Sequence, residues 1–313
     1  MTADLYDGDR EQTRAKHDLL KAYLRPLAYK ILQGRVGSLD FIDGFAGPWE
    51  SRDTAFTDTS FGIAVEILAG VQGHIAGSGR PPPAVRCIFN EADPLAFERL
   101  RGYVDEARQR HPGLDIVSLQ GRFDANAAEM NRLARNAFRL VFIDPTGWTG
   151  YPRDALMTLV SRAGFRPGAE VMINFMSSFV DRFFRTPEDR RNAWLEELLG
   201  PDRASWLRAE KATEAVIRRQ IAAMLREDLA LRYVCESPIV MSQANKIHFW
   251  MLYGTRSPMG VVVLRDSEFK ALGSHEETRD KRQRSGQGYS SISRFPAPFP
   301  TCAKDILPRS KVS

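Results

Sequence analysis

The chain has 313 residues, 43% of them apolar, which suits one large α/β domain with an insertion or two small domains, and argues against global disorder. It has no apolar run of the roughly 20 residues that a membrane span needs, and residues 1–10 are polar and acidic, so we expect neither a membrane anchor nor a secretion signal. The net charge of +5 lies at one end of the chain. Residues 279–313 hold eight basic and two acidic residues, whereas the other 278 residues hold 36 basic and 37 acidic ones. The body of the chain therefore offers no broad polyanion-binding face by composition.

Five apolar, strand-like runs alternate with helical patterns along the first 175 residues. The expected helices are residues 11–33, 61–68, 94–110, 125–136 and 155–163, with a Gly/Pro-rich loop at 73–83. The expected strands are residues 38–43, 85–91, 114–119, 139–144 and 169–175. This alternation predicts a doubly wound, mainly parallel, Rossmann-like α/β sheet whose strands are covered by helices on both faces.

The alternation ends near residue 180. Two β-rich runs, residues 233–242 and 247–254, predict an antiparallel hairpin at the sheet edge, and residues 260–270 predict a short helix or strand. We divide the chain into an N-terminal helical segment (1–36), a Rossmann-like core (37–180), a helical insertion that serves as a lid (181–231), edge strands (232–272) and a basic irregular tail (273–313).

An acidic or amide residue follows each of the five expected strands. These strand-end residues are Asp43, Glu91, Asp124, Asp144 and Asn174. Ligands of open parallel sheets bind beyond the carboxyl ends of the strands, so we expect the five side chains to line one ligand-binding edge. Each residue taken alone is equally well explained as a turn former or a helix cap.

The turn Asp43-Gly44-Phe45-Ala46-Gly47 places glycines where a backbone must approach a ligand closely. Glu91, with Ala92 beside it, is placed to accept the ribose hydroxyls of a cofactor, and Asp124 to accept from an adenine amino group. The spacing of an NAD fingerprint is missing, and so is a GxxxxGK[ST] phosphate loop. An acidic edge without a diphosphate site favours the cationic cofactor S-adenosylmethionine (SAM).

The fourth strand runs into Asp144-Pro145-Thr146-Gly147-Trp148. A carboxylate on a rigid proline turn suits methylation of an amine attached to a π-system. Asp144 and the Pro145 carbonyl would accept hydrogen bonds from the amine, and Trp148 or Tyr151 would stack on the ring. Asn174 is expected to bind the same substrate. The alternative is a turn that only caps the next helix.

A few reactive side chains lie outside the expected strand ends. Lys16 and His17, on the first helix, are candidates to fold back over the cofactor, although such a pair is more often solvated helix surface. We expect His248 to be a core histidine. Cys87 and Cys235 are expected to be ordinary buried residues of a reduced, cytoplasmic protein. No spacing of histidines, cysteines and carboxylates suggests a metal site.

In this order the elements resemble the three-Cys-motif partner (TcmP) family over roughly residues 13–270. The matching segments are Lys16-His17, FIDGFAGP at 41–48, NEAD at 90–93, FIDP at 142–145, INF at 173–175 and GTRSPMG at 254–260. The resemblance implies a class I methyltransferase-like fold that binds SAM, and association with a companion protein that bears a radical-SAM-like three-cysteine motif. It does not supply a reaction.

The chain departs from that family at two positions. Trp49 stands where the family has glycine, directly after the cofactor turn, and is expected to shape the substrate side of the pocket. Thr146 stands where the family has an aromatic residue, so a stacking ring is lost that Trp148 is placed to replace.

Four functions remain open from the sequence. The preferred one is a SAM-dependent methyltransferase that acts on an amine or other nucleophile of a small molecule or nucleobase-like substrate. The second is a nucleic-acid-modifying methyltransferase that grips phosphates with residues 279–313. The third is a non-catalytic partner of a three-Cys-motif protein, and the fourth an enzyme that transfers the aminocarboxypropyl group of SAM. No membrane partner is expected.

Overall fold

The computed structural model describes residues 11–47, 51, 53–134, 137–147, 149–160, 168–176, 192–240 and 247–285, with side chains for all of these except 11, 12, 192, 240, 248 and 272–285. A seven-stranded sheet, in the order β3-β2-β1-β4-β5-β7-β6, forms the centre of the described chain. Its strands are β1 (Ser38–Asp43), β2 (Ala84–Glu91), β3 (Asp115–Gln120), β4 (Phe138–Ile143), β5 (Ala169–Phe175), β6 (Tyr233–Val240) and β7 (Ile247–Thr255).

Strands β1 to β5 are parallel, while β7 pairs antiparallel with both β5 and the edge strand β6. This confirms the predicted fold class, including the antiparallel hairpin at the edge. In the register of the sheet, Asp43 at the end of β1 lies between Phe89 of β2 and Phe142 of β4. The carboxyl ends of these three strands therefore meet at one edge, where the strand-end residues were expected.

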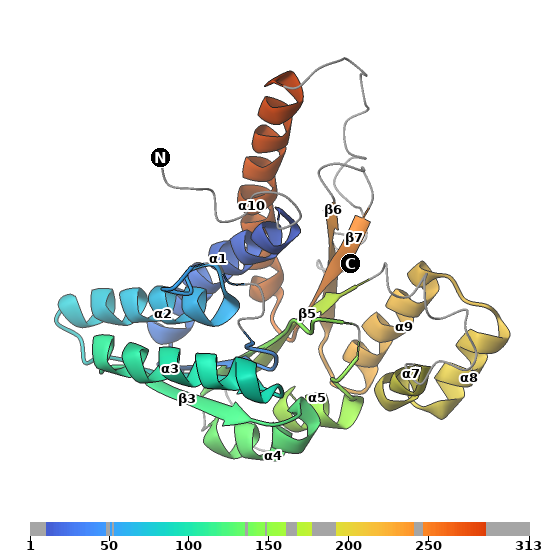
Figure 1. Cartoon of the computed structure of the whole chain (residues 1–313), viewed down its shortest axis with the longest axis horizontal. Coiled ribbons are helices and arrows are strands. Elements are labelled where there is room, and N and C mark those ends of the chain that lie inside the picture. The colour runs from blue at the N-terminus through green and yellow to red at the C-terminus, as the bar shows by residue number, and fades with distance from the viewer. Residues whose placement is uncertain are drawn as a thin grey trace, which may run out of the picture.

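Helices cover both faces of the sheet (Figure 1). On one face lie α1 (Glu11–Leu32), α2 (Ser60–Gly77), α3 (Pro94–Arg110) and the start of α10 (Pro258–Ser285). On the other lie α4 (Phe123–Leu133), α5 (Arg153–Val160), α7 (Asn192–Leu199), α8 (Pro201–Ala209) and α9 (Glu214–Glu227). Alternate strand residues feed the two cores, as with Phe41 and Ile42.

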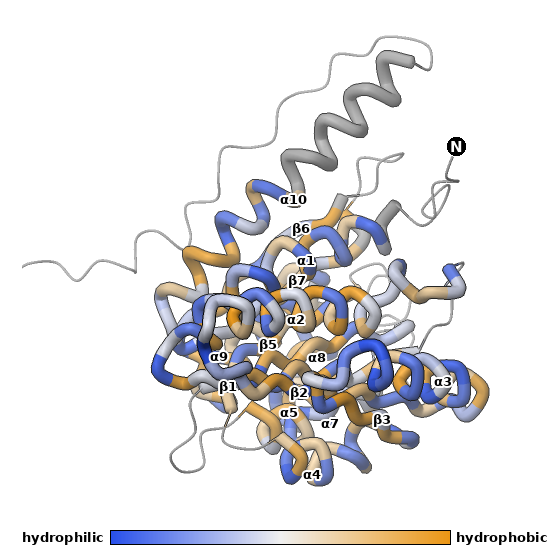
Figure 2. The backbone as a smooth tube through the Cα atoms, turned by 90° about the vertical axis from the view of Figure 1, so that its left-hand side faces the viewer, coloured by the Kyte–Doolittle hydropathy of each residue, from blue (hydrophilic) through white to orange (hydrophobic). Residues whose placement is uncertain are grey.

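Helices α1 and α2 lie side by side (Figures 1 and 2). The side chain of Lys16 in α1 reaches Asp144, and α2 begins with Ser60 beside Asp43, so both helices start at the carboxyl edge of the sheet. Both then run toward the opposite edge and parallel to each other, since each is followed by a strand that returns to the carboxyl edge.

Two helices are longer than the sequence predicted. Helix α2 continues to Gly77 through the buried residues Val71 and Ile75, so the loop expected from residue 73 starts later. Helix α10 replaces the predicted short helix or strand, and continues to Ser285 where an irregular tail was expected from Gly273. One glycine costs a helix only about 1 kcal/mol, and the Glu, Lys and Arg residues that follow favour helix.

The structure also bears on the membrane span and the two cysteines considered from the sequence. Among the described residues, no helix combines the length and the apolar character needed to span a membrane. Cys87 and Cys235 are buried free cysteines, as predicted. Residues 177–191, which open the expected helical insertion, lie outside the described residues, as do residues 286–313 of the expected basic tail.

Candidate functional site

The turn after β1 is held by a network of hydrogen bonds around the fully buried Asp43. One Asp43 carboxylate oxygen accepts the N–H of Phe45 at 3.0 Å, and the other accepts the hydroxyl of Ser60 at 2.5 Å. Position 44 needs glycine, because a Cβ there would lie 2.8 Å from the Phe123 ring and 3.0 Å from Ile143. The backbone of the predicted turn directly after β1 thus packs closely against Phe123 and Ile143.

The Asp43 carboxyl is unusual in its ionisation. Burial raises its pKa to about 7, since the charged form loses its hydration. The hydrogen bonds from Ser60 and from the Phe45 N–H act in the opposite direction, and the negative charges of Asp144 and Glu91 raise the pKa further. The ends of β1, β2 and β4 therefore bring three carboxyl groups within electrostatic range of one another.

Asn90, the residue before Glu91, ties the turns at this edge together. Its amide N–H group donates to the carbonyls of Gly44 at 3.2 Å and Gly121 at 3.0 Å, and its oxygen accepts from Asn126 at 2.7 Å. The Glu91 carboxylate is buried and accepts the N–H of Asp93 at 2.7 Å. These bonds fix Glu91 beside the glycine turn, which is where a cofactor ribose was expected.

Asp144 is held from two sides. The Lys16 ammonium contacts its carboxylate oxygens at 2.9 and 2.7 Å, and the amide of Asn174 donates to one of them at 2.6 Å. Lys16 thus reaches from α1 to the strand ends and also lies 5.7 Å from the centre of the Phe249 ring, while its expected position over the cofactor stays a prediction. Asn174 is buried, and its own side-chain oxygen accepts no hydrogen bond from the described residues.

Asp124 and Tyr151 are placed less favourably than expected. Asp124 lies in the first turn of α4 and forms a two-pronged pair with the exposed Arg122, at 2.9 Å for both bonds, which occupies the oxygens assigned to adenine. The Tyr151 ring is fully buried between Phe45 and Trp194. In this structure the ring packs against Phe45 of the turn after β1 and has no exposed face for stacking on a substrate.

The remaining predicted residues differ in how exposed they are. His17 is buried on α1, Ala46 and Pro145 are buried, Phe45 and Gly47 are half-buried, and Ala92 and Thr146 are exposed. Trp49 and Trp148 lie outside the described residues, and so does the His248 side chain, so their predicted roles stay predictions. No group of three metal-binding side chains occurs among the residues that the structure describes.

Three residues of this edge were not predicted. Ser60 donates to Asp43, and Asn90 with Asn126 joins the turns after β1 and β3. Asn90 had a readable signal, because it is a polar residue inside an otherwise apolar strand. Ser60 had none beyond being a helix-starting residue, since its contact with Asp43 depends on the path of the loop before α2.

Comparison with known proteins yielded structural likenesses only. No family model matches the chain, and neither does any curated protein. A spermidine synthase in complex with the transition-state analogue AdoDATO matches with 13% identity and a TM-score of 0.40, over 82% of this chain and 63% of the synthase. Spermidine synthase from Thermotoga maritima matches with 12% identity and a TM-score of 0.40, over 81% and 64%.

A loganic acid methyltransferase with SAH matches with 10% identity and a TM-score of 0.38, over 89% of this chain and 88% of that one. The sheet order and the antiparallel β7 give the chain its class. It has a class I methyltransferase-like fold. The chain spans less than two thirds of the length of the two synthases. Likenesses of this strength carry no information on its activity, and membership of the TcmP family stays a prediction.

Proposed function

We propose that the chain binds SAM at the carboxyl edge of its sheet and transfers the methyl group to an amine or other nucleophile of a small substrate. The observation that supports this most is the meeting of Asp43, Glu91, Asp144 and Asn174 at one edge, around a glycine turn. In their ionised forms, carboxyl groups this close attract a cationic ligand, and Lys16 offsets only part of their charge.

The residues of the edge fit SAM in three ways. Glu91 is fixed at the end of β2, where the acidic residue of dinucleotide folds accepts ribose hydroxyls. The Gly44 turn lets backbone approach the amino acid portion of the cofactor, and Asp43 lies behind it to balance an ammonium group. The side-chain oxygen of Asn174 is a buried acceptor with no donor among the described residues, and an N–H of a ligand would satisfy it.

Bound SAM would supply an electrophilic methyl group on its sulfonium. The chain's own contribution is to hold the acceptor. Asp144 and the Asn174 oxygen can both accept hydrogen bonds from one amine, which orients its lone pair. Lys16 and Asn174 fix the Asp144 carboxylate in turn, so that little reorganisation is needed when the amine arrives. Asp144 acts here as the group that positions the nucleophile.

Cofactor binding is tested by calorimetry with S-adenosylhomocysteine, the demethylated product. We expect Glu91→Gln to weaken binding about tenfold, as for loss of one charged hydrogen-bond acceptor. Glu129→Gln is the matched control, because Glu129 is exposed on α4 and pairs only with Arg132 there. Absence of binding by the unaltered chain, or an equal loss in both variants, would overturn the proposal.

Transfer is tested with SAM and a panel of amines and nucleobases, reading the cofactor product by chromatography. Methyl transfer leaves S-adenosylhomocysteine, whereas aminocarboxypropyl transfer leaves methylthioadenosine, so the product separates the two reactions. We expect Asp144→Asn to abolish turnover while the affinity for S-adenosylhomocysteine is kept, and Asp105→Asn, an exposed site on α3, to change neither. Tight cofactor binding with no transfer to any acceptor would favour the non-catalytic partner instead.

A further inference from the structure

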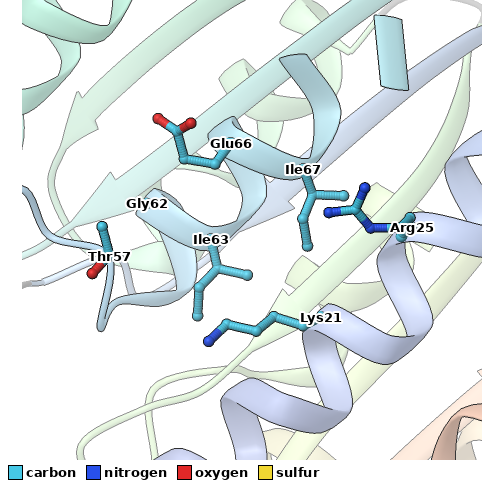
Figure 3. A pocket seen from close by; sticks show the side chains of 7 residues that line it. All are labelled: Lys21, Arg25, Thr57, Gly62, Ile63, Glu66 and Ile67. Carbon is cyan, nitrogen blue, oxygen red and sulfur yellow. The ribbon is translucent and has the colours of Figure 1, made fainter. Parts of the chain in front are cut away.

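A pocket of about 480 Å3 lies between α1 and α2, outside the set of strand-end residues (Figure 3). Its volume falls within the range of small-molecule sites, about 300–1,000 Å3. The lining residues are Lys21, Arg25, Thr57, Gly62, Ile63, Glu66 and Ile67. Two cationic side chains thus come from α1, and two buried isoleucines come from α2.

The cations of the pocket are largely available to a ligand. Lys21 and Arg25 are one helical turn apart, so they lie on the same face of α1. No described carboxylate forms an ion pair with Arg25. Within the part of the chain that the structure describes, the ion pair of Lys21 is a long contact of 3.9 Å with Asp18, and Asp18 also contacts Arg14 at 3.7 Å.

The nearby carboxylates are engaged elsewhere. Glu66 pairs with Arg110 and His111 of the neighbouring α3 segment, at 3.2 Å each, and in Figure 3 its carboxylate points away from the two cations. Asp53, in the loop before α2, accepts the N–H of Thr57 at 3.0 Å and also its hydroxyl. The pocket therefore presents positive charge above an apolar floor, which matches a small anion joined to an apolar group.

The pocket adjoins the proposed active site through the first turn of α2. Thr57 and Gly62 line it, and they flank Ser60, whose hydroxyl donates to Asp43. In addition, Lys21 is only five residues beyond Lys16, about 7.5 Å along the helix axis, and Lys16 holds Asp144. A ligand that spans the pocket and the strand ends must therefore extend over more than one turn of α1.

We propose that this pocket, lined by Lys21 and Arg25, binds the phosphate of a small phosphorylated acceptor substrate, with an apolar part of that substrate over Ile63 and Ile67. The inference rests on the proposed function, because the other end of the substrate is the nucleophile that Asp144 and Asn174 hold. It adds a substrate class: small molecules that carry both an amine or similar nucleophile and a phosphate. The guanidinium of Arg25 offers paired donors to two phosphate oxygens, and the Lys21 ammonium adds a point charge.

The test uses calorimetry with uridine monophosphate as probe and uridine as its uncharged partner, at saturating S-adenosylhomocysteine so that the strand-end site is filled. We expect uridine to bind at least tenfold more weakly than the monophosphate. Lys21→Gln and Arg25→Gln should each weaken the monophosphate about tenfold. Lys30→Gln, an exposed position on the same helix, should leave its affinity unchanged.

Equal binding of uridine and its monophosphate would overturn the proposal, and so would an equal loss in Lys30→Gln, which would indicate diffuse attraction to a basic helix. Unchanged affinity for S-adenosylhomocysteine in all three variants shows that the fold is intact. If that cofactor product binds but the monophosphate does not, this inference fails while the proposed function stands. If the cofactor product fails to bind the unaltered chain, the proposed function fails independently of the phosphate result.

In the transfer assay, the acceptor that gives turnover should lose it when its phosphate is removed. Lys21→Gln should raise KM about tenfold with kcat nearly unchanged, because the pocket lies away from the reacting atoms. A fall in kcat without a rise in KM would contradict the assignment.

Discussion

If the chain binds SAM as proposed, Asp43 should make that binding depend on pH. Its carboxyl is protonated below a pKa of about 7 and ionised above it, since burial penalises the charged form. The ionised form attracts the cationic ammonium of SAM, so the affinity for SAM should rise about fivefold between about pH 6 and about pH 7, where that ammonium is still charged. Calorimetry across this range measures the slope, and the proton released on binding can be read from buffers of different ionisation enthalpy.

The Asp43→Asn variant should bind SAM more weakly and without that slope, whereas Asp105→Asn should keep it. A flat profile for the unaltered chain would show that Asp43 does not titrate against the ligand. The same raised pKa has a consequence for the ligand-free protein. The protonated Asp43 carboxyl stabilises the folded chain fully below its unfolded pKa of about 4, and this contribution is lost as the pH rises through about 7. Asp43→Asn should therefore flatten the pH dependence of the unfolding free energy between about pH 4 and about pH 7.

Single residues of the site differ in how far the sequence reveals them. Asp43, Asp144 and Asn174 were predicted because the ends of parallel strands meet at one edge, whatever else the chain does. Asp124 was assigned to the same edge by its place after the third strand, but β3 ends at Gln120 and Asp124 pairs within its own turn. The contact of Lys16 with Asp144 spans 128 positions, which no local pattern encodes.

Helix α2 offers a test at the level of one element, because two of its glycines differ in their surroundings. A Cβ at Gly62 would lie 2.1 Å from the carbonyl oxygen of Phe56, in the loop that leads into the helix. A Cβ at Gly70 would meet nothing within 4 Å. We expect Gly62→Ala to destabilise the protein by about 1–3 kcal/mol through overpacking, and Gly70→Ala to stabilise it by about 0.5–1 kcal/mol.

Urea unfolding followed by circular dichroism measures both changes, and each variant serves as the other's control because the chemical change is the same. Thr59 caps this turn by accepting the Gly62 N–H at 3.1 Å, so the strain at Gly62 would also move Ser60 and its bond to Asp43. Gly62→Ala should therefore also weaken SAM binding. Equal stability of the two variants would mean that the loop around Phe56 shifts to accept the added methyl group without a measurable cost in unfolding free energy.

Elements were predicted best where periodicity and boundary residues agree. Helix α3 has the expected bounds, with Asp93 as its N-cap and Pro94 in its first turn, and β1 and β5 match the expected residues 38–43 and 169–175. The prediction stopped α10 too early because Gly273 and a polar composition were interpreted as a tail. This segment is helical because its Glu, Lys and Arg residues favour helix locally.

At the scale of the whole molecule, a cluster of buried polar side chains joins α1 to the sheet. Tyr23 of α1 donates to Glu170 of β5 and lies 2.6 Å from the hydroxyl of Tyr253 in β7, while Thr255 donates to Glu170 at 2.8 Å. Alternating strands and helices predicted the order of the layers, but they contained no information on this cluster, which joins residues up to 230 positions apart. Glu170 alone had a readable signal, as a charged residue inside a mainly apolar strand, but its partners could not be inferred from it.

This cluster gives a prediction for the stability of the fold as a whole. Burial raises the pKa of Glu170, and the Tyr23 hydroxyl lowers it again by stabilising the carboxylate. Tyr23→Phe should therefore destabilise the protein by about 1–3 kcal/mol, and the loss should be larger at about pH 8 than at about pH 5, because the hydroxyl stabilises the ionised form of Glu170, whose share rises with pH. Denaturant unfolding at the two pH values measures the difference.

Tyr29→Phe is the control, because Tyr29 lies on the same helix, half-buried, with an edge contact to His74 and no hydroxyl bond within the described residues. It should leave the unfolding free energy nearly unchanged at both pH values. A loss in Tyr23→Phe that is equal at the two values would mean that Glu170 keeps its proton throughout, and that the hydroxyl is only a neutral acceptor in the cluster. A pH-dependent loss instead identifies the Glu170 carboxylate as the charge that α1 covers. The same contact would then hold α1 in place, and with it Lys16 and Lys21 at the proposed site.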